Sequence, residues 1–167
     1  MILTRNKIIE EIKKENIKIK PFSKKLVGAA SIDLTLSNEF RIFNNNKDVI
    51  LNENSDYKKY TEFIKTKKII LKPDEFILGL TKERIKLPEN ICGWLYGRTR
   101  FARFGLSVHV TASFVQPGID NRQVLEIKNV SSSNLILKEG LRICQLILER
   151  TEGRAKYIGK FRNQTRL

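Results

Sequence analysis

The sequence predicts an all-β domain, built as a barrel or a sandwich. Short apolar runs recur along the 167 residues, and turn sequences such as Pro73-Asp74, Pro88-Glu89 and Pro117-Gly118 separate them. Short strands at this spacing are typical of barrels and sandwiches. The length suits one domain with a substantial core, and the chain contains no internal repeat and no linker. We therefore expect residues 1–167 to form a single domain.

The first predicted element is a short helix near the N-terminus. Thr4 can cap it, and Ile8, Ile9 and Ile12 form one apolar stripe. Such a short helix is marginal alone, so we expect it to pack on the rest of the domain. Residues 17–19 alternate isoleucine with lysine, which indicates an extended segment.

Strands are predicted wherever apolar residues alternate or run together between turns. In the first, Ile32, Leu34 and Leu36 share one face and Asp33 points to the other. The sequence also indicates a turn at 44–47, a surface loop over 52–60 and one helical turn at 100–104. The predicted strands cover residues 31–36, 40–43, 69–71, 76–80, 91–96, 106–112, 124–127, 134–137 and 141–148. The tail, residues 150–167, is basic and poorly periodic, and we expect it to order when an anion binds.

The formal net charge of +14 favours anionic partners, namely nucleic acid, an anionic membrane or a phosphorylated small molecule. Scattered lysines that serve solubility explain it equally well. No apolar run is long enough to span a bilayer.

Cys92 and Cys144 lie far apart and His109 is the only histidine, so the chain lacks a usual zinc ligand set and the zinc-deaminase signature. Two free thiols and no signal peptide suit a reducing, cytoplasmic setting.

The stretch from Gly97 to Glu126 carries the candidate chemistry. Arg98, Arg100 and Arg103 lie at one end, and guanidinium groups pair well with phosphate oxygens. Glu126 lies at the other end between apolar residues, where a carboxylate needs a partner or a task. Phosphate-binding groups together with a possible proton acceptor suggest a nucleotide enzyme.

This stretch resembles a known family. Residues 97–106, Gly-Arg-Thr-Arg-Phe-Ala-Arg-Phe-Gly-Leu, look like the dCTP deaminase signature Gly-Arg-Ser-Ser-Leu-Ala-Arg-Leu-Gly-Leu. Residues 108–112 are similar to that family's His-Val-Thr-Ala strand, and Val124-Leu125-Glu126 match the position of its catalytic glutamate. Further matches follow in the family order at 30–34, 71–76 and 160–164. The resemblance thus covers almost the whole chain.

The resemblance implies a distorted β-barrel or jelly roll, related to trimeric dUTPases. It also implies a homotrimer with active sites between subunits. The reaction would convert dCTP and water to dUTP and ammonia without zinc, with Mg²⁺ carried on the triphosphate. A candidate feedback ligand is dTTP.

The resemblance assigns catalytic roles to three residues. Glu126 would be the general base and acid, taking a proton from the attacking water and passing one to N3 of cytosine. Partial desolvation would raise its pKa, and a nearby arginine would oppose this. Arg103 would orient Glu126, and Thr99 would replace the serine that positions the water. From the residues alone, the favoured interpretation of Glu126 is a strand carboxylate facing water beside Lys128, and that of Arg103 is a surface arginine.

Substrate contacts follow from the same resemblance. Arg98 and Arg100 would bind phosphate, although Arg100 stands where the family has a second serine. Backbone groups of residues 110–112 would distinguish the amino group of cytosine from the oxygen of uracil. His109 is interpreted as structural. The full predicted contact set is Arg98, Thr99, Arg100, Phe101, Ala102, Arg103, Val110, Thr111, Ala112, Gln116, Val124, Leu125, Glu126, Tyr157, Lys160 and Gln164.

Gln116 bears on the end product. In dUTPases and bifunctional relatives an aspartate aligned here activates the water that attacks the phosphate, and glutamine cannot act as a base. Asp120 lies four residues further along a turn, which is a different place. The sequence therefore predicts deamination that stops at dUTP. The alternative is a bifunctional deaminase and diphosphatase, or a dUTPase, that produces dUMP.

A second alternative is a non-catalytic module on the same fold, which senses nucleotide or binds nucleic acid. The departures at Thr99, Arg100 and Gln116 would suit such a protein. The chain lacks the regular aromatic platform of single-strand binders, which disfavours nucleic acid.

Overall fold

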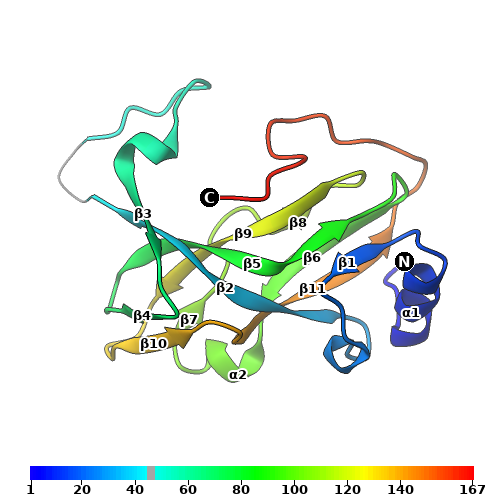
Figure 1. Cartoon of the computed structure of the whole chain (residues 1–167), viewed down its shortest axis with the longest axis horizontal. Helices are drawn as coiled ribbons and strands as arrows, with labels where there is room; N and C mark the ends of the chain where they lie inside the picture. Colours follow the sequence, from blue (N-terminus) through cyan, green and yellow to red (C-terminus); the bar gives the residue numbers. More distant parts are fainter. Residues whose placement is uncertain (45–47) are drawn as a thin grey trace.

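A computed structural model describes residues 1–44 and 48–167, and the predicted turn at 44–47 falls largely outside this range. The chain is mostly β, so the predicted fold class is confirmed (Figure 1). The helical elements are α1 (Arg5–Lys13), α2 (Thr99–Ala102) and the 3-10 turns η1 (Lys24–Leu26) and η2 (Tyr57–Tyr60). The strands are β1 (Lys18–Lys20), β2 (Ile32–Phe43), β3 (Thr61–Lys65), β4 (Lys68–Leu71), β5 (Phe76–Lys86), β6 (Ile91–Gly97), β7 (Leu106–Ser107), β8 (Phe114–Val115), β9 (Asp120–Asn129), β10 (Leu135–Lys138) and β11 (Arg142–Arg150).

One curled antiparallel sheet forms the body of the molecule (Figure 1). Its strands run in the order β7-β9-β5-β2-β11-β6-β8, with β1 added to β5 and β3 added to β2. Strands β4 and β10 form a separate two-stranded ladder. Strand β9 shows how alternation places the site: Leu125 and Ile127 are fully buried, and Glu126 between them points to the other face. The central pairing of β9 with β5 sets Leu78 directly opposite Glu126.

The main core is built from side chains of most strands of this sheet and of α1. Its largest fully buried side chain is Phe40, and isoleucine and leucine from most strands surround it. A second, smaller cluster is built by Leu78, Leu80 and Leu167, with Phe43, Tyr57, Phe76 and Val124 packed around it. This second cluster lies beside the candidate site, because several of its members line the same cavity.

The strands of the structure differ from the predicted ones at three places. The strands predicted at 31–36 and 40–43 are one strand, β2, because β3 and β5 continue the ladder along it past an irregularity between Leu36 and Phe40. The stretch 52–60 ends in the 3-10 turn η2, and β3 after it was missed. The strand predicted at 106–112 stops at Ser107, because the backbone amides beyond it turn toward a side chain instead of a neighbouring strand.

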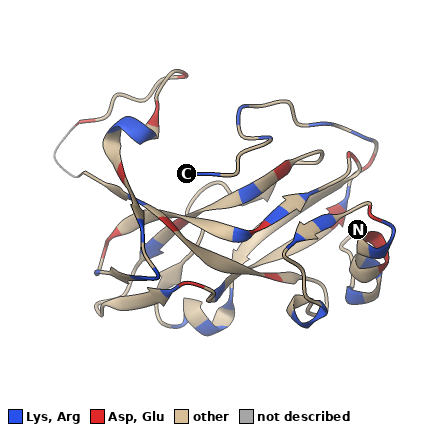
Figure 2. Ribbon diagram, viewed as in Figure 1, with Lys and Arg blue, Asp and Glu red and all other residues tan. Residues whose placement is uncertain are grey.

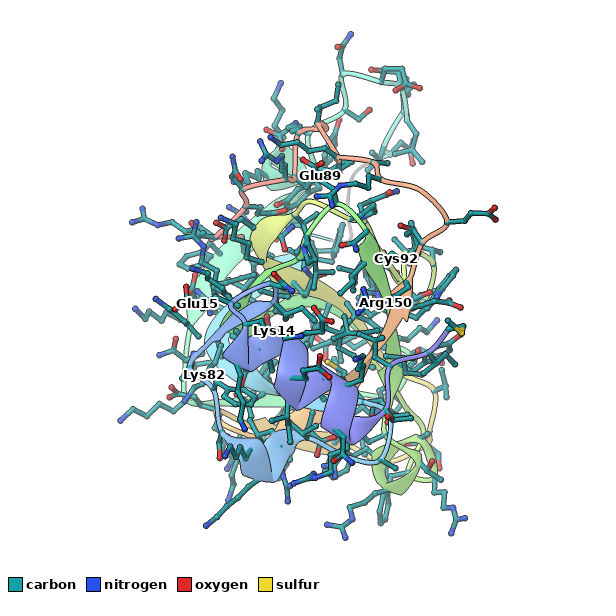
Figure 3. The ribbon with its side chains drawn as sticks, turned by 90° about the vertical axis from the view of Figure 1, so that its right-hand side faces the viewer. Lys14, Glu15, Lys82, Glu89, Cys92 and Arg150 are labelled. Carbon is teal, nitrogen blue, oxygen red and sulfur yellow. The ribbon has the colours of Figure 1, made fainter. Side chains whose placement is uncertain are left out.

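Helix α1 packs on the end of the sheet, as expected. Thr4 is its N-cap residue, but the predicted side-chain cap is absent, and Arg5 instead donates its backbone N–H to Ala29 O at 2.7 Å. Glu11 of α1 is only 5% exposed and forms an ion pair with Arg150 of β11. Figure 3 views the molecule from the side on which α1 lies and labels Arg150. Asn16 donates to the same carboxylate at 2.8 Å, so the buried charge is doubly satisfied.

The tail is packed against the sheet, contrary to the expectation that it orders only with a ligand. Asp120 and Arg122 donate their backbone N–H groups to Arg162 O and Gln164 O at 2.9 and 2.8 Å. Leu167 is 5% exposed in the second apolar cluster. These contacts hold residues 157–164 along the mouth of the site.

Lysine and arginine are dispersed over helices, strands and the tail, with fewer acidic residues among them (Figure 2). This distribution favours the interpretation of the net charge of +14 as mainly a solubility feature. Among the described residues, no helix is long and apolar enough to cross a membrane.

Candidate active site

Glu126 is held by a turn of backbone that points three successive amides at it. Its Oε2 accepts N–H groups from Val110 at 3.0 Å, Thr111 at 2.6 Å and Ala112 at 3.4 Å. The Thr111 hydroxyl lies 3.0 and 2.9 Å from the two carboxylate oxygens. Successive amides aimed at one point form a concave anion site. The segment 108–113 therefore folds around the ionised carboxylate.

The predicted rise in the pKa of Glu126 was wrong. Burial does raise this pKa, but the amide and hydroxyl of Thr111 and the amides of Ala112 and Val110 outweigh it, and the pKa lies below its ordinary value of 4.5. Backbone donors, rather than the expected arginine, stabilise the charge. Because the folded-state pKa is lowered, this carboxylate stabilises the fold above pH 4.5, and that contribution is lost as pH falls through the folded-state pKa.

The amides of residues 110–112 are engaged with Glu126 in this structure, and their predicted role in reading the base stays a prediction. The prediction assigned them to reading cytosine, whereas all three donate to Glu126. Val110 is 52% exposed, so the predicted apolar face shared with Leu106 and Val108 ends before it.

Glu126 lines a cavity of about 580 Å³, which is large enough for a nucleotide. Apolar and aromatic residues from several separate segments, including the tail, contribute to its lining. Among the cavity-lining residues that the structure describes, Glu126 is the only carboxylate. The cavity is lined by Phe43, Tyr57, Phe76, Leu78, His109, Val110, Thr111, Ala112, Phe114, Val115, Gln116, Ile119, Asn121, Arg122, Gln123, Val124, Glu126, Tyr157, Phe161 and Gln164.

Several predicted contacts thus share this cavity with Glu126. Gln116 is exposed and lines this cavity. Val124 also lines it, because alternation along β9 places Val124 on the same face as Glu126. Tyr157 is half-buried and packs on the core, and Gln164 lies 3.4 Å from the Tyr57 hydroxyl. Lys160 does not line the cavity, and its ammonium lies 5.9 Å from the Phe161 ring. Leu125 is fully buried on the opposite face, so it supports the strand without reaching the cavity.

Asp120 does not substitute for an acid at position 116. Its carboxylate pairs with Arg84 Nε at 2.7 Å, and it does not line the cavity that contains Glu126.

The signature residues of α2 lie away from Glu126 within one chain. Figure 1 shows α2 at the bottom of the view, while the tail crosses the top. Thr99, Arg100 and Arg103 are exposed and do not line the cavity that contains Glu126. Arg103 therefore does not reach Glu126 within one chain. Its predicted role in orienting Glu126 would need a second copy and stays a prediction. Ala102 lines a second cavity of about 430 Å³, which borders Val110 and Thr111 from the other side, and Phe101 packs on the core.

The glycine near the end of this motif, Gly105, is required for steric reasons. Gly105 has φ of 78°, in the left-handed region, and a Cβ there would lie 2.7 Å from the Ser131 side chain. The turn lets Val130 donate its N–H to Gly105 O at 2.8 Å, which ties the motif to the end of β9.

Arg98 is engaged inside the chain rather than extended toward solvent. Its Nη2 lies 3.2 Å from Asp33 Oδ2, and its Nη1 donates to Arg142 O at 3.0 Å. The structure therefore uses the first arginine of the signature to join α2 and β6 to β2 and β11.

His109 lies between the two cavities. Both ring nitrogens are buried without a hydrogen-bond partner in the described part of the chain. Burial lowers the pKa of His109, and the charge of Glu126 only partly opposes this, so the imidazole is neutral at pH 7. The interpretation of His109 as structural stays a prediction.

Sequence reasoning missed the aromatic side of the cavity. Phe43 and Phe76 stack with ring centroids 5.3 Å apart, and Tyr57 comes from the segment predicted as a surface loop. These residues lie on three different segments, so no local pattern connects them. The sequence clue was that Phe43 ends one predicted strand and Phe76 begins another.

Comparison with known proteins places this geometry in context. A family model described as dCTP deaminase-like matches residues 2–151. A protein named "dCTP deaminase, dUMP-forming" from Mycolicibacterium vanbaalenii is 34% identical over 160 residues, covering 94% of this chain and 84% of the relative. A protein of the same name from Beutenbergia cavernae is 32% identical over 159 residues, covering 93% and 83%.

The fold also matches a solved structure, the 2'-deoxycytidine 5'-triphosphate deaminase from Agrobacterium tumefaciens. The TM-score is 0.72 at 15% identity, over 90% of this chain and 48% of that one. The chain thus spans about half the length of that solved protein, and the likeness supports the fold.

The names of the relatives correct one prediction. Gln116 was taken to mean that the reaction ends at dUTP, whereas the similar proteins are named dUMP-forming, which supports the alternative. The inference was too strong because Gln116 excludes only its own side chain as a base. It says nothing about groups that other segments bring to the same cavity.

The family model covers most of the chain, the relatives exceed 30% identity, and Glu126 lies in a nucleotide-sized cavity. This chain belongs to the dCTP deaminase-like family.

Proposed function

We propose that this protein converts dCTP to dUMP, by deaminating the cytosine and removing diphosphate. The observation that carries the proposal is Glu126, ionised by three backbone amides at the wall of a nucleotide-sized cavity. The family membership and the names of the relatives support the same reaction. The balanced reaction consumes dCTP and two waters and releases dUMP, ammonia and diphosphate.

Glu126 would act as the base and acid of deamination. Its carboxylate, kept ionised by the amides of residues 110–112, would take a proton from the water that adds to C4. It would return that proton to N3 as the carbon becomes tetrahedral. It would then take the proton of the C4 hydroxyl and pass it to the amino group, so that ammonia leaves as the C4 carbonyl forms. Gln116, at the same cavity wall, can donate and accept hydrogen bonds and so hold a water, although it cannot take its proton.

Magnesium would enter as part of the substrate. The described residues contain no group of three or more His, Cys, Asp or Glu side chains that could hold a metal ion. Mg²⁺ is often bound mainly through substrate phosphates and water, and its charge would ease attack at the α-phosphate.

We further propose that the working site is shared between copies, in a homotrimer. Thr99, Arg100 and Arg103 are exposed on α2 and line neither cavity, so one chain alone does not assemble the signature with Glu126. A neighbouring copy is the simplest source of these groups.

Product analysis tests the reaction. Purified protein incubated with dCTP and Mg²⁺ should release dUMP, ammonia and diphosphate in equal amounts, resolved by ion-exchange chromatography. A zinc-selective chelator should leave the rate unchanged. Accumulation of dUTP would contradict the second step, and dCTP binding without turnover would instead identify a nucleotide-sensing protein.

Thr111→Val tests how Glu126 is kept ionised. The variant keeps the shape and the amide but loses the hydroxyl that lies 2.9 Å from Glu126 Oε2, so the pKa of Glu126 should rise. Because the ionised form accepts the proton, activity is lost as pH falls through this pKa. The acid limb of kcat for dCTP should therefore move to higher pH in the variant.

Thr4→Val is the matched control, since the Thr4 side chain makes no capping bond. Its pH profile should equal that of the unmodified protein. An unmoved acid limb in Thr111→Val would show that this hydroxyl does not set the pKa of the working base.

A further inference from the structure

A cluster of charges at the other end of the sheet from the tail joins three strands. Asp33 on β2 faces Arg98 at the end of β6 and Arg142 at the start of β11. Its Oδ2 lies 3.2 Å from Arg98 Nη2 and 3.6 Å from Arg142 Nη1. One carboxylate oxygen thus holds two guanidinium groups side by side.

The two arginines differ in how much of each remains open. The Arg98 side chain is 21% exposed, donates to Arg142 O at 3.0 Å, and lies 5.8 Å above the Phe101 ring. The Arg142 side chain is 47% exposed, and its one ion pair in the described structure is the longer contact with Asp33. Arg98 is therefore bound to other groups of the chain, and Arg142 is the arginine that faces solvent.

The solvent side of this cluster carries excess positive charge. Two guanidinium groups face one carboxylate, and Arg100 is exposed two residues beyond Arg98. A second carboxylate, Glu83, is 2% exposed and accepts from the Thr35 N–H at 2.9 Å and its hydroxyl at 2.6 Å. Glu83 is buried and its oxygens are bound to Thr35, so it leaves the outer face of Arg142 cationic.

We propose that Arg142 binds a phosphate group of the nucleotide triphosphate, and that Asp33 and Arg98 are positioning residues for it. This inference rests on the proposed function, in which the α2 end of one copy meets the Glu126 cavity of another. Guanidinium pairs with phosphate through two parallel N–H bonds, and a carboxylate behind it fixes its orientation in advance. Arg142 is 44 residues from Arg98 in the sequence, so no motif connects them.

Substitution of Arg142 tests the phosphate contact. Arg142→Gln should raise the KM for dCTP by about tenfold or more while kcat changes much less, since a lost ground-state contact weakens binding. Arg142→Lys should recover part of the loss, because it keeps the charge without the paired N–H groups. Arg154→Gln is the matched control: this arginine is 68% exposed and pairs only loosely with Glu89, at 3.8 Å.

Asp33→Asn tests the positioning role. It should also raise KM, and the double variant with Arg142→Gln should be little worse than Arg142→Gln alone, because Asp33 acts through Arg142. Independent losses that multiply would show that Asp33 acts on something else. A thermal melt of each variant separates these effects from unfolding, and Arg142→Lys keeps the test decisive if the asparagine variant does not fold.

A binding measurement separates this proposal from the proposed function. Calorimetry with inorganic tripolyphosphate should show weaker binding to Arg142→Gln than to the unmodified protein, whether or not dCTP is turned over. Unchanged binding of tripolyphosphate and an unchanged KM would overturn the role of Arg142. Failure of the unmodified protein to deaminate dCTP would instead overturn the proposed reaction.

Discussion

Glu126→Gln is expected to lower the rate of ammonia release from dCTP by about 100- to 10,000-fold, the usual share of a general acid–base. Glutamine has nearly the same shape but cannot accept the proton from water. Its amide oxygen can still take an N–H from the 110–112 segment, which now donates three to Glu126. Binding of dCTP, measured by calorimetry, should therefore change little.

Glu62→Gln provides the control for this substitution. Glu62 is an exposed glutamate on β3 and lines none of the cavities described above, so its replacement should leave both turnover and binding unchanged. Substantial activity in Glu126→Gln, with the fold verified by thermal unfolding, would remove Glu126 from the mechanism.

Glu126→Gln also separates deamination from diphosphate removal when dUTP is supplied directly. If it still cleaves dUTP, the two steps use different bases, and a group outside this carboxylate activates the second water. If it fails on both substrates, Glu126 serves both steps, as expected from its being the one carboxylate among the described residues lining the cavity.

Two inactive variants are expected to restore activity when they are mixed. Glu126→Gln lacks the base and Arg103→Ala lacks an α2 contact, and the structure places these positions apart within one chain. In a shared site, a copy with intact Glu126 meets a copy with intact Arg103. With random assembly from equal amounts, about a quarter of the sites contain both, so roughly a quarter of the normal activity should return.

The measurement requires subunit exchange. The two variants are unfolded together, refolded, and assayed for ammonia release from dCTP, with each variant refolded alone and the unmodified protein refolded as controls. Sedimentation verifies the assembly. A mixture that forms trimers but stays inactive would show that both residues act within one copy.

Alternation predicted the strands well where each has one buried face. In β9, buried Leu125 and Ile127 flank Glu126, and the sequence pattern alone places that carboxylate away from the core. The same rule failed at 106–112, where Val110 is half exposed. There the amides bind the Glu126 carboxylate, which is a contact 14 to 16 residues away that no local period contains.

Local patterns also missed β3 and the full length of β2. Polar residues at 37–39 suggested a break, yet neighbouring strands on both sides supply ladder partners and carry β2 through it. Strand formation there is decided by the neighbours rather than by the propensity of the segment itself.

The sequence by itself determined the all-β class, the family and the identity of the candidate base, because alternation and the signature at 97–106 are local patterns. Tertiary structure alone decided the charge state of Glu126, the packing of the tail and the joining of Arg98 and Arg142 by Asp33. Each of these depends on the position of a hydrogen-bond donor or a charge relative to a group distant in the chain. Such interactions act over a few ångströms in space, so only the folded arrangement of the strands determines them.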